Sequence, residues 1–222
     1  MVRSLTKLLT ESEVEAFVMS QQVQIDRDFG PIWNTFADIK MAKTDEDITK
    51  YAWQVLLLDN TDQANDLGYH DENGSNGEPR AKVFVQTTLD YGLQWTVTAS
   101  HEILEMLVDP KITNTVIYGQ FQYALEVCDP CEDDKFAYEI AGLNMSAFVT
   151  PQWFAQKSGT QFSFPQINEI KMPFDLAPGG FISRRKWNWN SAHSESWEQY
   201  MADEIGPRAL NKGPSSRTKR RK

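Results

Sequence analysis

One segment near the middle of the chain constrains the fold more than any other. From Leu93 to Val108 apolar residues recur at helical spacing, and Pro110 then ends the segment because its ring does not fit a helix interior. The run HEILE, residues 101–105, lies inside this segment with apolar residues on both sides. We therefore expect a largely buried helix that carries three ionisable side chains.

The run has the pattern H-E-x-x-E, which differs from the zinc-hydrolase pattern H-E-x-x-H in its last residue. Residues four apart lie on one face of a helix, so His101 and Glu105 can hold one cation between them. A carboxylate is a normal zinc ligand, and the exchange therefore keeps the geometry while lowering the positive charge of the centre. Glu102 points to an adjacent side, where it can deprotonate a water molecule. The pattern predicts His101 and Glu105 as metal ligands and Glu102 as the general base.

A third metal ligand must come from another part of the chain. Glu126, which lies on a predicted strand beside several other acids, is the first choice, and Asp129, Asp109 and His70 are the alternatives. We expect one divalent ion, with zinc first. Because the ligand set is rich in oxygen, Mn²⁺, Fe²⁺ and Ca²⁺ remain alternatives.

Other interpretations compete with a metal site. H-E-x-x-E alone is a weak pattern, since surface helices often carry glutamates at this spacing, and the helix acids could simply pair with lysine and arginine. The apolar flanks favour a metal, because a buried charge is costly unless it is paired. Cys128 and Cys131 form a single C-x-x-C without a second pair for a zinc ribbon or a thioredoxin-like strand-to-helix setting, so we expect ordinary thiols.

The order of predicted elements indicates an α+β domain over residues 1–206. A capping box at residues 10–13 starts an amphipathic helix that is expected to run to Gly30 and Pro31. Residues 60–80 are expected to be a long exposed loop, residues 151–190 irregular packed structure, and residues 196–205 a short helix. The predicted strands are residues 53–58, 81–87, 121–127 and 136–140.

The charge is distributed unevenly. Residues 207–222 hold seven basic and no acidic side chains, so the remaining residues, with fifteen basic and thirty-one acidic side chains, carry a formal charge of −16. Such an acidic body is not typical of a nucleic-acid-binding domain, and any contact with nucleic acid would be made by the basic tail, which we expect to be disordered. No signal peptide or membrane-spanning run is visible. The expected location is cytoplasmic or virion-associated.

Several segments together resemble a poorly characterised bacterial and phage family with zincin-like features. They are LDN at 58–60, LGYH at 67–70, AKVF at 81–84, SHEILEMLVDP at 100–110 and LEVCDP at 125–130. The resemblance covers about residues 10–185, and the S-H-E-x-x-E-x-x-x-D-P segment is its most specific part. It implies a zincin-like α+β fold in which a small mixed sheet, with an edge strand over a cleft, lies above a central helix that bears the motif.

By the same resemblance the chain is expected to be a metal-dependent, peptidase-like hydrolase. Its substrate would be a peptide or a cell-wall crosslink, with His101 and Glu105 as ligands and Glu102 as the base. The second hypothesis is a non-catalytic binding module or virion structural protein derived from a zincin, with virion assembly partners and a structural or vestigial metal. Glu105 in place of histidine is the departure that keeps both hypotheses open.

Overall fold

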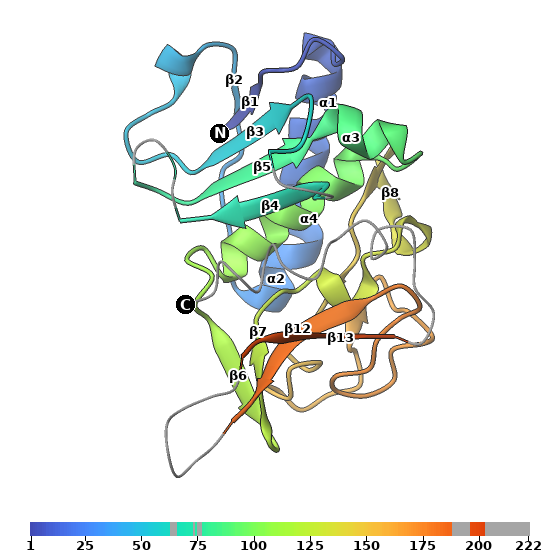
Figure 1. Cartoon of the computed structure of the whole chain (residues 1–222). Coiled ribbons are helices and arrows are strands. Elements are labelled where there is room, and N and C mark those ends of the chain that lie inside the picture. Colours follow the sequence, from blue (N-terminus) through green and yellow to red (C-terminus); the bar gives the residue numbers. More distant parts are fainter. Residues whose placement is uncertain (63–65, 73, 75–76, 188–195, 203–222) are drawn as a thin grey trace.

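The computed structural model describes residues 1–62, 66–72, 74, 77–187 and 196–202. They form a mixed α+β structure of several sheets and few helices, as the order of elements predicted (Figure 1). The helices are α1, Glu11–Val23; α2, Gly30–Trp33; α3, Val85–Asp90; and α4, Trp95–Val108. A π-helix covers Gln24–Phe29, and short 3-10 helices cover Asp45–Asp47, Asp129–Cys131 and Asp134–Phe136.

The strands fall into two larger sheets and two small ones. The first sheet has the order β2-β1-β3-β5-β4, and a second sheet has the order β13-β12-β7-β6; β8 pairs with β9 and β10 with β11. The strands of the first sheet are β1, Val2–Ser4; β2, Met41–Ala42; β3, Gln54–Leu58; β4, Gly68–Asp71; and β5, Arg80–Phe84. The others are β6, Thr115–Tyr118; β7, Phe121–Ala124; β8, Tyr138–Ile140; β9, Leu143–Met145; β10, Phe148–Val149; β11, Ser163–Phe164; β12, Phe181–Lys186; and β13, Glu198–Met201.

The first sheet is mixed, as expected. Strands β2, β1, β3 and β5 are parallel, whereas the edge strand β4 runs antiparallel to β5, with His70 opposite Ala81. Helices α1 and α4 pack on this sheet through a shared apolar cluster that includes Phe17, Ile103 and Val83 (Figure 1). Burial of such side chains stabilises the fold by about 1.5–3 kcal/mol each.

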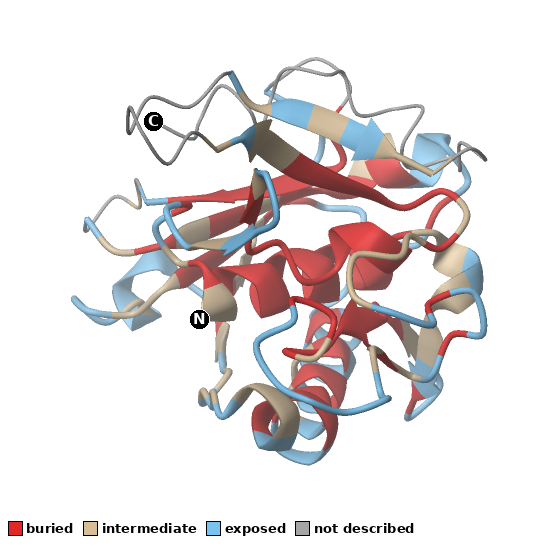
Figure 2. Cartoon of the chain, turned by 90° about the horizontal axis from the view of Figure 1, so that it is seen from below, coloured by how far each residue is buried: buried red, intermediate tan, exposed pale blue. Residues whose placement is uncertain are grey.

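Helix α4 lies between two apolar cores. Ile103 packs into the cluster under the first sheet, while Leu104 packs into a second, aromatic-rich cluster around Trp153 and Phe148. Every residue of α4 from Thr96 to Met106 is buried, and the buried residues gather at the middle of the molecule (Figure 2). The expectation of a largely buried motif helix is therefore confirmed, and its polar residues lie in an environment where charge needs a partner.

The first helix begins as the sequence predicted and ends later. The Thr10 side chain accepts a hydrogen bond from the Glu13 N–H, and the Glu13 carboxylate accepts one from the Thr10 N–H, which is the expected capping box. Helical backbone then continues through the π-helix and α2 to Trp33, where Asn34 adopts a left-handed conformation. The predicted end at Gly30 and Pro31 is wrong, because proline is tolerated in the first turn of α2 after the wider π-turn.

Some predicted elements are wrong or shifted. The expected loop at residues 60–80 contains β4, whose four residues are all buried, because pairing with β5 and packing on α4 outweigh its weak strand propensity. The strand expected at 81–87 ends at Phe84, and a helical turn follows in which the Thr88 hydroxyl donates to the Phe84 carbonyl. The strand expected at 121–127 ends at Ala124, so Glu126 lies beyond it.

The expected irregular segment 151–190 is interrupted by β11 and β12, and the short helix expected at 196–205 is wrong for residues 198–201. These residues form β13, because antiparallel pairing with β12 and stacking of Arg184 on Tyr200 outweigh a helical pattern of barely ten residues. Residues 203–205 and the basic tail 207–222 lie outside the described residues. Among the residues that are described, no helix is both long and apolar enough to cross a membrane.

Candidate metal centre

The two predicted ligands on α4 face each other. His101 Nε2 lies 3.1 Å from Glu105 Oε1, one helical turn away, and the two side chains are 2% and 0% exposed. The contact follows from the spacing of four residues, which places both side chains on one side of the helix. The sequence therefore placed this pair correctly relative to each other.

Strand β4 brings a second histidine to the same helix. His70 Nδ1 lies 3.4 Å from Glu102 Oε2 and 4.0 Å from Glu105 Oε2. The approach is close because residue 68 is glycine: a Cβ atom there would lie 3.1 Å from Glu102 Cγ and 2.9 Å from Thr98 Cγ2. The edge strand and the motif helix thus share one polar interface.

The other ring nitrogen of His70 is held by the end of α4. Its Nε2 lies 3.1 Å from the Asp109 carbonyl oxygen, which can only accept, so Nε2 carries a hydrogen. Burial lowers the pKa of His70, but its hydrogen bond to Glu102 and the charges of Glu126, Glu102 and Glu105 outweigh burial and raise it. Nδ1 faces Glu102 and Glu105, and it can offer its lone pair to a cation when it carries no proton.

A third segment, which follows β7, completes the cluster. Asp129 Oδ1 lies 3.3 Å from His101 Nε2, and the Cys128 N–H donates to Glu105 Oε1 at 3.3 Å. The backbone at Gly180 packs closely against this segment, since a Cβ atom at that position would lie 2.1 Å from the Pro130 carbonyl oxygen, and the Ala177 N–H donates to that oxygen at 3.0 Å. Sequence-distant segments therefore converge on Glu105.

Among the described residues, the convergence produces three overlapping sets of potential metal ligands. In each set the ligand atoms lie within 4.8 Å of one another and all residues are buried. The sets are His70 with Glu105 and Glu126; His101 with Asp129 and Glu132; and His101 with Glu105 and Cys128. Glu105 and His101 each belong to two of them.

The sequence-predicted residues are placed as follows. His101 and Glu105 meet directly, Glu102 lies beside His70, and Glu126 meets Glu105 in the set that contains His70 rather than in a set with His101. Asp129 lies beside His101. The assignment of His101, Glu105 and Glu126 as ligands to one ion stays a prediction.

The remaining alternative ligand, Asp109, has a structural role. Its Oδ1 accepts hydrogen bonds from the N–H groups of Thr113 and Asn114, both at 2.8 Å, and so shapes the turn after α4. The sequence also contains two ligand candidates that we did not predict, Cys128 and Glu132. A cysteine and an acid in a turn carry no periodic signal, and the sequence marks them only by the C-x-x-C that contains Cys128 and by the acidic residues around Glu132.

The chemistry of this donor set suits a divalent cation. Carboxylates that converge in a region with little access to water repel each other, and a cation removes that repulsion. Burial raises the pKa of the Cys128 thiol well above its ordinary value, with the Glu105 charge adding to the effect. Cys128 is therefore a neutral thiol unless a metal ion replaces its proton.

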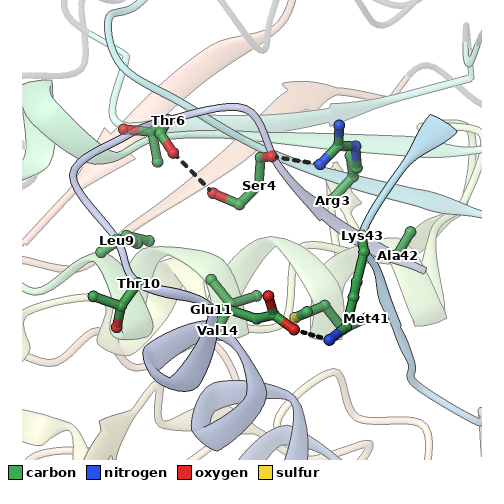
Figure 3. Close-up of a pocket in the computed structure, with 10 residues that line it drawn as sticks. All are labelled: Arg3, Ser4, Thr6, Leu9, Thr10, Glu11, Val14, Met41, Ala42 and Lys43. Carbon is green, nitrogen blue, oxygen red and sulfur yellow. Dashed lines mark hydrogen bonds and ion pairs between the residues drawn. The ribbon is translucent and has the colours of Figure 1, made fainter.

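Two surface cavities lie away from the cluster. Figure 3 shows the first, of 190 Å³, where Lys43 pairs with Glu11 and the guanidinium of Arg3 donates to the Ser4 carbonyl. The second, of 510 Å³, is mainly apolar and is lined in part by Ile103 and Met106, on a different face of α4 from Glu105. Neither cavity is lined by the histidines and carboxylates of the cluster.

Comparisons with known proteins add no relative. No family model matches the chain, and searches of the curated proteins and of the solved structures found no match. The resemblance to zincins stays a prediction, and functional inference depends on the cluster itself.

Proposed function

We propose that the chain is a metal-dependent hydrolase of the zincin type, with a peptide or a cell-wall crosslink as its substrate. The observation that carries the proposal is the contact of His101 Nε2 with Glu105 Oε1 at 3.1 Å, one turn apart on a buried helix. This contact supports the prediction of both residues as ligands. Zinc is the first choice of ion, because imidazole, carboxylate and thiol groups all lie within reach of one point.

The arrangement of elements supports the proposal. Zincins place the edge strand of a small sheet over the helix that bears the motif, and here the antiparallel edge strand β4 packs on α4 (Figure 1). The peptide groups of such an edge strand can pair with an extended substrate. An extended peptide is therefore the substrate class that fits best.

The residues divide into ligands and a base. His101 and Glu105 hold the ion, and Asp129, Glu132 and Glu126 are further carboxylates that share a ligand set with one of them. A divalent ion here would act as a Lewis acid on a carbonyl oxygen and acidify a water molecule. Glu102 is the proton acceptor, and His70 Nδ1, 3.4 Å from its Oε2, positions that carboxylate.

A second candidate function is favoured by one observation. The side chains of His70, His101, Glu102 and Glu105 are all between 0% and 2% exposed, whereas a catalytic ion needs a position that substrate can reach. The alternative is a binding or virion structural module in which the ion stabilises the fold. It predicts that removing the ion lowers the melting temperature and that no hydrolysis accompanies the loaded protein.

The Glu102→Gln variant separates the two functions. We expect it to keep its metal content and to lose about 100-fold to 10,000-fold in turnover of casein or peptidoglycan, because the amide cannot accept a proton. The exposed Glu139→Gln variant on β8 is the matched control and should hydrolyse at the wild-type rate. Activity is measured before and after chelation, together with zinc by elemental analysis.

Each outcome decides between the functions. Undiminished hydrolysis by Glu102→Gln contradicts its role as base. A zinc-loaded wild-type chain that hydrolyses neither substrate, but melts at a lower temperature after chelation, supports the structural module. A chain that takes up no metal contradicts both.

A further inference from the structure

We propose that the centre holds two divalent ions bridged by Glu105, rather than one. The inference rests on the proposed metal site and extends it. One ion is assigned to His101, Asp129 and Glu132, and the second to His70 and Glu126. Glu105 contributes one oxygen atom to each.

The two carboxylate oxygens of Glu105 lie near different histidines. Oε1 lies 3.1 Å from His101 Nε2, and Oε2 lies 4.0 Å from His70 Nδ1. Because the two histidines come from α4 and β4, they approach the carboxylate from different elements. A carboxylate placed in this way binds one ion through each oxygen, and such pairs of ions lie about 3.5–4 Å apart.

The remaining donors separate into one group per histidine. Asp129 and Glu132 join His101, and Glu126 joins His70, in sets whose ligand atoms lie within 4.8 Å of one another. Glu126 thus meets the second histidine and not the first in these sets. With Glu105 added, each ion receives at least one imidazole and two carboxylates, which is sufficient for a stable site.

The hydrogen bond of His70 prepares its other nitrogen as a ligand. Nε2 donates to the Asp109 carbonyl at 3.1 Å, which leaves Nδ1 on the side of Glu102 and Glu105. Metal-binding histidines are generally fixed by such a bond from the nitrogen that does not bind the ion. His70 is therefore built as a ligand, beyond serving as a partner of Glu102.

Formal charge matches two ions better than one. Glu105, Glu126, Asp129 and Glu132 carry four negative formal charges, all four are at most 1% exposed, and the neighbouring Glu102, also 1% exposed, adds a fifth. Two divalent ions balance four of these five charges, whereas a single ion balances two. Because net charge in a buried site is costly, the second ion is expected to bind once the first is present.

A pair of ions would also give separate roles to the His101 site and the His70 site. In two-metal hydrolases the ions together hold the attacking and departing oxygen atoms. Glu102, beside His70, would then accept the proton of the attacking oxygen atom on the side of the second ion. Removing His70 should therefore affect turnover even though His101 remains.

The test is metal stoichiometry on the full chain. The protein is stripped with a chelator, reloaded with Zn²⁺ or Co²⁺ at micromolar free concentration, and dialysed. Elemental analysis counts the bound ions, and electron paramagnetic resonance of the Co²⁺ form detects coupling between them. We expect two ions per chain and a coupled spectrum.

Single-site variants locate each ion. His70→Gln and Glu126→Gln should each reduce the count to one and abolish the coupling, while Asp129→Asn should weaken the other site. Asp28→Asn removes a buried carboxylate that bonds Arg27 and Tyr138 outside the cluster, so it is the matched control and should keep two ions. Circular dichroism verifies that each variant is folded, and the wild-type count does not depend on the variants.

The outcomes separate this inference from the proposed function. One ion per wild-type chain overturns the bridged pair and leaves the hydrolase proposal standing. A count of two ions in His70→Gln and in Glu126→Gln also overturns it, whether or not the ions are coupled. The second ion would then bind to other residues. No bound ion overturns both.

Discussion

Asp109, at the end of the motif, supports the metal centre through hydrogen bonds and is not assigned as a metal ligand. Its carboxylate holds the turn after α4 through the Thr113 and Asn114 N–H groups, and its carbonyl holds His70. The sequence made Asp109 a ligand candidate because an acid one turn beyond Glu105 looks like a donor. Its short backbone contacts, which no spacing rule predicts, assign it a structural task instead.

The role of Asp109 predicts a loss of stability on truncation. Asp109→Ala removes the acceptor of two N–H groups on the exposed residues Thr113 and Asn114 and should lower the free energy of unfolding by about 1.5–3 kcal/mol. Hydrogen bonds to a charged acceptor are worth about 1.5–3 kcal/mol each, and water can replace part of both bonds at these residues. Asp109→Asn keeps a side-chain oxygen and should lose less than half as much. Urea denaturation measures both. Equal stability of Asp109→Ala and wild type would rule out this role.

Some residues of the centre could be predicted from the sequence and others could not. His101 and Glu105 could be paired because helical geometry relates residues four apart with no knowledge of the rest of the fold. Glu126 and Asp129 were found as nearby acids, and His70 as an alternative, but their arrangement around Glu105 depends on tertiary packing. Cys128 and Glu132 were not predicted, since the segment after β7 is positioned by a backbone contact at Gly180.

Among the elements, β4 is the one that the sequence missed and the site most needs. Gly68 and Asp71 read as turn residues, yet the strand is buried and pairs with β5. By contrast, α1 was recognised from its capping box and α4 from its apolar spacing, because both signals are local. The sheet edge forms through long-range pairing, which a short polar strand does not reveal.

Because β4 packs closely on α4, adding one methyl group at Gly68 should lower both stability and metal affinity. Gly68→Ala would place a Cβ atom 2.9 Å from Thr98 Cγ2 and 3.0 Å from the Lys82 carbonyl oxygen. We expect β4 to move outward, unfolding free energy to fall by about 1–3 kcal/mol, and metal affinity to decrease as His70 moves. Urea denaturation and competition with a chromophoric chelator measure the two effects.

Gly119→Ala is the control for Gly68→Ala. Gly119 has a φ of 60°, and a Cβ atom there has no neighbour within 4 Å, so alanine costs about 1–2 kcal/mol of backbone strain without touching the centre. Its metal affinity should equal that of wild type. If both variants bind metal equally well, β4 does not position the ligands.

For the whole molecule, the centre lies where separate parts of the fold meet. Helix α4 contacts the core under the first sheet and the aromatic-rich core, and the ligand candidates come from β4, α4 and the segment after β7. The sequence predicted the α+β class from the order of elements. It could not predict that the motif helix separates two cores, because that arrangement depends on side chains from distant segments.

This position predicts that a bound ion stabilises the whole fold. At a free Zn²⁺ concentration one thousand times the dissociation constant, stabilisation is about 4 kcal/mol, which raises the melting temperature by about 8–16 °C for a chain of this size. Differential scanning calorimetry with and without chelator measures the change. The melting temperature of Glu105→Gln should change little on chelation. A wild-type melting temperature that does not change on chelation would contradict a bound ion that links the two cores.

Anomalous diffraction from zinc-loaded crystals is the most direct test of the central claim, that α4 holds a divalent ion between the side chains at 101 and 105. We expect an anomalous peak at about 2.0–2.2 Å from both His101 Nε2 and a Glu105 oxygen. Absence of a peak there in a fully loaded crystal, with the two side chains still in direct contact, would contradict this claim.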